Sequence, residues 1–499
     1  MPKKILAVDM GASSGRVILA QFDGKRIDIE EMHRFDNTAV MINGTYYWDV
    51  LKQFDEIKKG VGKAAKTGDL DSLGIDTWGV DFGLLDRHGD LMQNPVHYRD
   101  QRTAGIVPKV EALLDDKGLY KRTGIQIMEL NTIFQLYALA KNRPELLEKA
   151  DCALLMPDLL GYFLTGEKVS EYSIASTTQL LNPYTKEWDR ELLGKIGISE
   201  NIFPDVVPSG RTLGPVLPHI REELGLGSTR VISTACHDTA SAIVAAPADD
   251  DDFIYISCGT WSLFGTEIAE PIINDTSLRH NVTNEGGYGG TIRFLKNIIG
   301  LWLIQETRRQ YRREGQEYSY SDLEKLALAS EPFKYFIDPD AEVFVPHGDL
   351  PRRVREYCVN TGQGCPETVG EIMRCIYESI AMKYRYAFEQ IRECTGKDYR
   401  RIHMIGGGTK DNLLCSMAAS ATGRTIVAGP IEATALGNIA VQLMSLGEIS
   451  DIRQAREIVR NSFEPEVYEP TETAEYDAAY AKFRKIIDAQ QKTRETKLC

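Results

Sequence analysis

The feature that most constrains the fold is a short turn of very small residues that occurs twice, each time between two apolar runs. The first copy reads Asp9-Met-Gly-Ala-Ser-Ser-Gly15, and the second reads Ser257-Cys-Gly-Thr-Trp-Ser262. Apolar runs of strand length joined by such a turn predict a β-hairpin. Because the two copies lie about half a chain apart, they predict a degenerate internal repeat, in which two similar domains bring their turns together across a cleft.

The length of the chain agrees with this repeat. A chain of 499 residues exceeds the size at which a single apolar core keeps growing. The segment Pro247–Asp252 ends in four consecutive aspartates, which are unsuited to a buried element and indicate an exposed link. We therefore predict an α/β protein with domains at residues 1–246 and 253–447, followed by an extension at 448–499 whose helix packs back.

Charge and cysteine content narrow the classes of function. The formal net charge is −14 and the isoelectric point is about 5.2, which disfavours nucleic acid and anionic membranes as partners. The N-terminus has no apolar signal-peptide core, so we expect a cytoplasmic protein, as a monomer or a homodimer. Nine cysteines without a C-x-x-C pair indicate reduced thiols rather than a disulfide framework.

Short β-like runs alternate with amphipathic segments along the whole chain, as is typical of α/β proteins. Strands are expected at residues 5–9, 16–22, 26–35 and 73–77, with a return strand at 82–85. Helices are expected at residues 131–141, 154–164, 369–394 and 474–492.

The two turns have the chemistry of a phosphate-binding site. Backbone N–H groups in a small-residue turn converge on phosphate oxygens, and the hydroxyls of Ser13, Ser14 and Thr260 add further donors. Arg16 supplies positive charge, whereas Asp9 fits beside a polyanion only if a cation such as Mg²⁺ lies between them. The alternative is a plain hairpin with small turn residues; the repetition favours the phosphate site.

A third small-residue turn supports a nucleotide as the phosphate ligand. Gly406-Gly-Gly408 stands between an apolar strand and the start of a helix, whose N-terminus favours negative charge. The chain has neither G-x-x-x-x-G-K-[ST] nor a G-x-G-x-x-G behind its first strand. As a nucleotide enzyme it would therefore be one of those that bind phosphates with β-hairpins.

Asp238 is the candidate general base. It follows His237 where a strand leads into a helix of small residues, just before the predicted link. A carboxylate there can accept the proton of a sugar hydroxyl as the oxygen attacks a γ-phosphate. A helix N-cap is the ordinary alternative for such an aspartate. Trp78 in the nearby Asp-Thr-Trp-Gly stretch either stacks on a sugar or fills the core.

These residues together resemble the FGGY carbohydrate kinases of the actin, Hsp70 and sugar-kinase superfamily, over essentially the whole chain. The segments that carry the resemblance are AVDMGASSGRV, GIDTWGVDFGLLD, ACHDTASA, CGTWSL, TNEGG and KNIIGLWLIQ. The last segments are most similar to the FGGY kinases that act on L-rhamnulose. The resemblance implies two RNase H-like domains that close over the substrates, with transfer of the ATP γ-phosphate to the 1-hydroxyl of L-rhamnulose in the presence of Mg²⁺.

The resemblance also implies roles for individual residues. Asp238 would be the proton acceptor, and Asp9 would face Mg²⁺ through water. The residues implied to contact ATP are Ala12, Ser13, Ser14, Gly15, Arg16, Thr260, Gln305 and Gly407. The residues implied to contact the sugar are Gly79, His237, Asp238, Thr239 and Asn297.

Two other functions stay open from the sequence. An FGGY kinase of another ketose or polyol, such as L-fuculose, xylulose or glycerol, would carry the same turns and differ only in pocket residues. A non-catalytic actin-like ATP-binding scaffold would also carry two phosphate hairpins, but it would not need the His-Asp-Thr segment.

Overall fold

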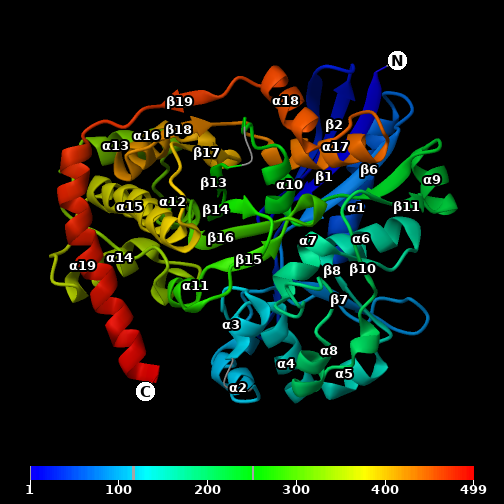
Figure 1. The fold of residues 1–499 in the computed structure, drawn as a ribbon, viewed down its shortest axis with the longest axis horizontal. Coiled ribbons are helices and arrows are strands. Elements are labelled where there is room, and N and C mark those ends of the chain that lie inside the picture. Colours follow the sequence, from blue (N-terminus) through cyan, green and yellow to red (C-terminus); the bar gives the residue numbers. More distant parts are fainter. Residues whose placement is uncertain (1, 115–117, 250–251, 499) are drawn as a thin grey trace. The chain divides into compact units, whose positions relative to one another are not determined.

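The computed structural model describes residues 2–114, 118–249 and 252–498. Helices and strands alternate along the chain, as the α/β prediction requires (Figure 1). The contacts divide the chain into two compact units with discontinuous boundaries. Unit 1 comprises Met1–Asp251, Thr266–Leu295 and Glu432–Glu464, and unit 2 comprises Asp252–Gly265, Lys296–Ile431 and Pro465–Cys499. The domain boundaries predicted from the sequence, at residues 246, 253 and 447, remain a prediction.

Unit 1 is built on a six-stranded sheet with the strand order β11-β12-β6-β1-β2-β3. Its strands are β1 (Lys3–Met10), β2 (Ser14–Phe22), β3 (Ile27–Asp36), β6 (Ser72–Thr77), β11 (Arg211–Pro215) and β12 (Arg230–Ser233). β1, β2 and β3 form consecutive antiparallel pairs, whereas β6 runs parallel to both β1 and β12. The three N-terminal strands predicted from the sequence are confirmed.

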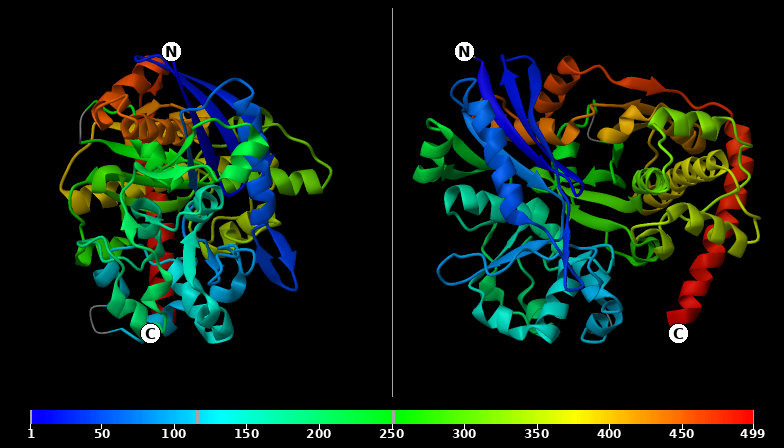
Figure 2. Two further views of the ribbon diagram at one scale, coloured as in Figure 1. Left: turned by 90° about the vertical axis from the view of Figure 1, so that its right-hand side faces the viewer. Right: turned by 180° about the vertical axis from the view of Figure 1, so that it is seen from behind.

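Helices cover both faces of this sheet. They are α1 (Val50–Ala65), α6 (Met156–Thr165), α10 (Asp238–Val244) and α17 (Ala433–Ser445). Side chains of a strand alternate between faces, so Leu73 and Ile75 of β6 join the apolar core with α1 and α6. Ser72 and Asp76 point the other way and bond to polar residues of α17. Figure 2 shows α1 in blue beside the blue strands β1–β3.

The remaining elements of unit 1 are short. Its other strands are β4 (Val40–Ile42), β5 (Thr45–Tyr47), β7 (Phe82–Leu85), β8 (Cys152–Leu155), β9 (Ser170–Glu171), β10 (Val206–Val207) and β15 (Thr283–Gly286). Its other helices are α2 (Val107–Glu111), α3 (Gly118–Thr123), α4 (Thr132–Asn142), α5 (Pro144–Lys149), α7 (Tyr172–Ala175), α8 (Arg190–Lys195), α9 (Pro218–Leu224), α11 (Asp275–His280) and α18 (Ile452–Ser462). β15 pairs antiparallel with the first half of β16 (Ile292–Ile299).

One prediction about this unit is wrong. The strand at 82–85 does not return beside residues 73–77: β7 pairs instead with β8 in a separate two-stranded sheet. The chain leaves the main sheet because Val80 has a φ of 68° and the Asp81 carboxylate binds the indole N–H groups of Trp48 and Trp78. The helix expected at 154–164 accordingly begins later, at Met156, since β8 includes residues 154 and 155.

Unit 2 repeats the topology of unit 1. Its sheet has the order β14-β13-β17-β18-β19, formed by β13 (Ile254–Cys258), β14 (Trp261–Ile268), β17 (Arg401–Ile405), β18 (Thr425–Ala428) and β19 (Glu466–Tyr468). β17 runs parallel to β13 and β18 runs parallel to β17. A hairpin followed by two parallel strands also describes β2-β1-β6-β12, so the predicted repeat is confirmed in the fold.

The helices of unit 2 are α12 (Trp302–Arg313), α13 (Tyr320–Leu328), α14 (Leu350–Asn360), α15 (Val369–Thr395), α16 (Asn412–Thr422) and α19 (Thr473–Leu498). The long helices α15 and α19 confirm the predictions at 369–394 and 474–492. A capping box between Thr368 and Glu371 starts α15, and Gly396 in a left-handed conformation ends it. Along α15 almost every turn contributes buried side chains.

Three further expectations concern the link, the thiols and membranes. Residues 250 and 251 of the predicted link lie outside the described residues, and the flanking Asp249 and Asp252 are exposed. The cysteines in the described part of the chain are all free thiols. None of the helices described combines the length and the apolar character that a membrane span requires.

Candidate active site

The first hairpin turn is braced from behind by a buried asparagine. Gly11 N–H donates to the Ser14 carbonyl at 2.9 Å, and Asn37 binds both the Gly11 and Ser13 carbonyls, at 2.8 and 3.2 Å. Gln53 in turn holds the side chain of Asn37. The turn carbonyls are therefore engaged on the protein side, whereas Ser13 is exposed. This arrangement suits a turn that offers donors to an anion.

Gly15 has a packing reason of its own. A Cβ added there would lie 2.3 Å from the Phe35 ring and 2.6 Å from the Met10 sulfur. The core of the hairpin therefore requires a glycine at this position, independently of any ligand at the turn.

Charged groups stand at the base of this hairpin. Asp9 and Arg16 are direct partners in the β1–β2 register, and their side chains form an ion pair. The Arg16 guanidinium also pairs with Glu432, which immediately precedes α17. The Arg16 guanidinium thus pairs with two carboxylates, which hold it beside the turn.

Two aspartates lie near the carboxyl ends of the neighbouring parallel strands β1 and β6, and a third follows the next parallel strand, β12. Asp9 and Asp76 are register partners on β1 and β6, and the segment after β12 leads to Asp238. The Asn438 amide donates to Asp76 Oδ2 at 2.6 Å, whereas Oδ1 of Asp76 has no hydrogen-bond partner within the described residues. Burial and the nearby Asp9 charge raise the pKa of Asp76 well above its ordinary value. The parallel sheet therefore concentrates negative charge at one edge.

Asp238 has the environment of a general base. It is the first residue of α10, with His237 at the N-cap position, so the simple N-cap alternative is wrong. Its Oδ1 accepts from the N–H and the hydroxyl of Thr239, and none of the hydrogen bonds among described residues goes to Oδ2. Burial, reinforced by Asp9, raises the pKa of Asp238 to about 7. A carboxylate with this pKa is suited to proton abstraction near neutral pH.

A buried glutamate holds the loop that carries Asp238. Glu171 accepts the Cys236 N–H at 3.1 Å and the Ser173 hydroxyl at 2.6 Å, and that hydroxyl accepts the His237 N–H at 3.1 Å. Thr77 N–H donates to the Cys236 carbonyl at 2.9 Å and ties the same loop to β6. The backbone on either side of His237 is therefore fixed by Glu171 and by β6.

Gly79 lies two residues beyond Thr77, which also forms a β-bridge with His237. A Cβ at Gly79 would lie 3.2 Å from the Thr177 side chain, so larger residues do not fit without movement. Trp78 is 6% exposed and donates its indole N–H to Asp81 at 3.0 Å. Of the two roles left open for Trp78, its burial favours core packing.

Unit 2 gathers most of its predicted nucleotide residues around the second hairpin. The Thr260 carbonyl accepts the N–H groups of Gly300 and Trp302, each at 3.2 Å, which joins the turn to the start of α12 and hence to Gln305. Gly408 packs so closely on Cys258 that an added Cβ would lie 2.1 Å from its sulfur. The triple glycine thus lies directly beside the turn. Asn297 lies on β16, just before this junction.

The residues present fit ATP. The buried Oε1 of Gln305 has no hydrogen-bond partner within the described part of the chain, as expected of a group reserved for a ligand. A Cβ added at Gly407 would meet no protein atom within 4 Å, so its backbone faces open space. Both observations agree with the nucleotide contacts that the sequence predicted.

The residues present also fit Mg²⁺ held by a single carboxylate. Asp9, next to the first turn, supplies a carboxylate oxygen of the kind that Mg²⁺ prefers. Among the residues described, no group of three or more His, Cys, Asp or Glu is arranged as an all-protein metal site. Such a cation would therefore depend on water and phosphate oxygens, as predicted for Asp9.

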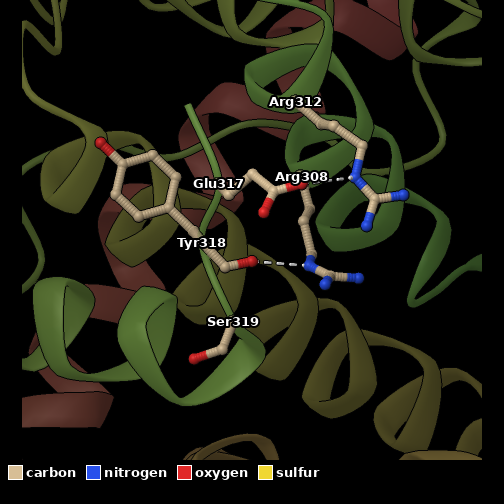
Figure 3. A pocket seen from close by; sticks show the side chains of 5 residues that line it. All are labelled: Arg308, Arg312, Glu317, Tyr318 and Ser319. Atoms are coloured by element: carbon tan, nitrogen blue, oxygen red, sulfur yellow. Dashed lines mark hydrogen bonds and ion pairs between the residues drawn. The ribbon is translucent and has the colours of Figure 1, made fainter. Parts of the chain in front are cut away.

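A surface pocket of about 300 Å³ opens elsewhere in unit 2 (Figure 3). It is lined by Arg308, Arg312, Glu317, Tyr318 and Ser319. Arg308 donates to the Tyr318 carbonyl at 2.7 Å, and Arg312 lies 3.6 Å from the Glu317 carboxylate. Because both guanidinium groups already face protein oxygens, we assign no ligand to this pocket.

Sequence reasoning missed several residues of the site. The structure places Glu171, Glu285, Arg293, Glu432 and Asn438 next to predicted residues. Asn438 lies among small residues at the start of α17. The reason is now visible: a Cβ at Gly437 would lie 1.7 Å from the Ser241 carbonyl oxygen, so α17 packs closely against α10 only with glycine there. Asn438 carried no signal that linked it to Asp76.

Comparisons with known proteins agree with this geometry. Rhamnulokinase of Bacteroides thetaiotaomicron is 42% identical over 488 residues, covering 98% of this chain and all of that protein. Rhamnulokinase of Oceanobacillus iheyensis is 42% identical over 464 residues, covering 93% of this chain and 97% of the relative. The crystal structure of a gluconate kinase from Lactobacillus acidophilus has the same fold, with a TM-score of 0.81, 18% identity and 98% coverage of both chains.

The family assignment rests on both halves of the chain. Residues 254–446 match the C-terminal domain of the FGGY family of carbohydrate kinases, and residues 4–245 match its N-terminal domain. The two matches contain both small-residue hairpins, Asp238 and the triple glycine. With its repeated fold and family matches over both halves, the chain belongs to the FGGY family of carbohydrate kinases.

Proposed function

We propose that this kinase transfers the γ-phosphoryl group of ATP to the 1-hydroxyl of L-rhamnulose, giving L-rhamnulose 1-phosphate and ADP in the breakdown of L-rhamnose. The observation that supports L-rhamnulose as the substrate is the 42% identity to a rhamnulokinase over 98% of the chain. A cytoplasmic location and a monomeric or dimeric state remain predictions.

Asp238 would act as the base. As the sugar oxygen forms its bond to the γ-phosphorus and the bond to the ADP oxygen breaks, the hydroxyl proton passes to the Asp238 carboxylate. In a loose phosphoryl-transfer transition state the nucleophile needs little activation by a base. Positioning of the substrates and neutralisation of the phosphate charge therefore account for much of the rate acceleration. Bound Mg²⁺ would supply that neutralisation at the phosphate oxygens, held near Asp9.

The other predicted residues divide by substrate. The first turn (Ala12 to Arg16) offers backbone and side-chain donors to the phosphates, and Thr260, Gln305 and Gly407 contact the nucleotide. Gly79, His237, Thr239 and Asn297 contact the sugar. The exposure of Ser13 and the unpartnered Gln305 oxygen support these roles.

The test is a coupled assay of ADP release with L-rhamnulose, L-fuculose and L-xylulose at equal concentrations. We expect the highest kcat/KM with L-rhamnulose. A higher kcat/KM with another sugar would show that this other sugar is the substrate. Filaments that form with ATP, without sugar-dependent turnover, would support the actin-like scaffold instead.

A further inference from the structure

His237 lies between a buried arginine and the candidate base. Arg293, on β16, is fully buried and donates from Nη2 to His237 Nδ1 at 2.8 Å. The same nitrogen donates to Glu285 at 3.1 Å, and Arg293 Nε donates to the Gly286 carbonyl at 2.8 Å. Glu285 and Arg293 are register partners of β15 and β16, so the hairpin itself presents the pair to His237.

These contacts determine which nitrogen of His237 carries the proton. An arginine has only N–H donors, so His237 Nδ1 must accept and therefore has no proton. The neutral imidazole then carries its proton on Nε2, which lies 3.4 Å from Asp238 Oδ1. The alternative places a proton on Nδ1 toward Glu285, 3.5 Å away, and would set two N–H groups against each other at 2.8 Å.

The electrostatic surroundings keep the ring neutral. Burial and the Arg293 charge lower the pKa of His237 well below its ordinary value. The charged groups that face the His237–Asp238 pair are Arg293 of β16, Glu285 of β15, Asp9 of β1 and Asp76 of β6. The carboxylates would favour an imidazolium; the direct contact with Arg293 opposes it.

We propose that Arg293 is a positioning residue that holds His237 in its neutral form with the proton on Nε2. His237 then faces Asp238 only as a donor and does not compete for the proton of the sugar hydroxyl. Together with Thr239 it occupies the Oδ1 side of the carboxylate, which assigns proton acceptance to Oδ2. This inference rests on the proposed role of Asp238.

A purely structural role for the buried Arg293–Glu285 pair makes a different prediction. Loss of such a pair lowers stability without changing the protonation of His237. Arg456 offers a matched control, because it is equally buried in unit 1, pairs with Glu267 and donates to the Ile243 carbonyl without a described contact to His237.

The experiment uses the full chain without ligands, labelled with ¹⁵N-histidine, and a His237→Gln variant to assign the resonances. In the unmodified protein we expect His237 to show a proton on Nε2 only, with no titration between pH 6 and 8. In Arg293→Met we expect the pKa of His237 to rise above its value in the unmodified protein, because the burial remains but the opposing Arg293 charge is gone, whereas Arg456→Met leaves it unchanged.

Kinetics provide the second readout. A protonated His237, 3.4 Å from Asp238, would weaken that carboxylate as a base, so the ratio of kcat/KM between pH 8 and pH 6 should be larger in Arg293→Met than in the unmodified protein, and unchanged in Arg456→Met. If Arg293→Met does not fold, the double variant with Glu285→Gln removes the buried pair as a whole and is measured in the same way.

Three results would overturn the inference: a proton on Nδ1 in the unmodified protein, titration of its His237 near pH 6.5, or equal pH profiles for the Arg293 and Arg456 variants. The resonances are read without substrate, so a failure of the proposed sugar specificity leaves this test intact.

Discussion

The two hairpins of the repeat have the same backbone plan and different chemistry. At the base of the first, Asp9 and Arg16 form an ion pair, and Arg16 also reaches Glu432. At the base of the second, the groups are neutral: the Ser262 hydroxyl lies 2.6 Å from the Tyr384 hydroxyl of α15, and Cys258 is buried beside them.

This difference indicates a division of labour. The carboxylates Asp9, Asp76 and Asp238 are collected in unit 1, and among them we propose the cation site and the proton acceptor. Unit 2 offers backbone groups, hydroxyls and the Gln305 amide, which suit a nucleotide without altering the charge near it. Substitutions in unit 1 should therefore affect the reaction, and those in unit 2 should affect nucleotide binding or stability.

The largest effect is expected from Asp238→Asn. The amide cannot accept the hydroxyl proton, so kcat should fall by about 10² to 10⁴ while both substrates still bind, as measured by steady-state kinetics and calorimetry. The matched control is Asp411→Asn in unit 2, an N-cap whose pKa is also raised by burial. Near-normal turnover of Asp238→Asn would show that Asp238 is not the general base.

The pH dependence tests the same residue without substitution. Because the raised pKa of Asp238 is about 7 and the base acts only when deprotonated, kcat/KM should fall about tenfold per pH unit below that value. The profile is measured with both substrates well below saturation. A flat profile between pH 5 and 7 would contradict the assignment.

Asp9→Asn tests the cation in unit 1. Loss of the carboxylate should raise the Mg²⁺ concentration for half-maximal activity by about 10- to 100-fold, the usual size for groups that act on a metal through bound water. Glu432→Gln is the control, because it leaves the Asp9–Arg16 pair in place. Equal Mg²⁺ requirements in the two variants would show that Asp9 does not face the cation.

Thr260→Val tests the neutral hairpin. Removal of a hydroxyl that binds a charged phosphate should raise the KM for ATP about tenfold. The KM for the sugar should stay within about twofold, since the hydroxyl is assigned to the nucleotide. A change in the KM for the sugar alone would contradict the assignment of Thr260 to the nucleotide.

The smallest effect is expected from Tyr384→Phe. This variant loses the hydrogen bond to Ser262 behind the second hairpin, which should lower the free energy of unfolding by about 1 kcal/mol in urea titrations. We expect kcat to stay close to that of the unmodified protein. A fall in kcat as large as that expected of Asp238→Asn would show that the second hairpin takes part in the reaction.

Much of this molecule was predictable from local patterns. Apolar periodicity, turn residues and helix caps act over a few neighbouring residues. These local signals predicted the hairpins, the repeat, the long helices α15 and α19 and the strand-to-helix junction at His-Asp-Thr. The strand at 82–85 was predicted with its bounds, but its pairing was not predictable in this way, because its partner β8 lies about 70 residues away and the Asp81 bonds redirect the chain.

The sequence by itself determined that Asp238 stands at a strand-to-helix junction and that two small-residue turns are available for phosphates. Only the tertiary structure decided the chemical surroundings of Asp238. Glu171 fixes the backbone before Asp238, Arg293 donates a hydrogen bond to His237, and Asp9 lies close enough to raise the pKa of Asp238. The reason is physical. Turn formation depends on neighbours in the chain, whereas the pKa and the protonation of a side chain depend on burial and on charges that other strands bring to it.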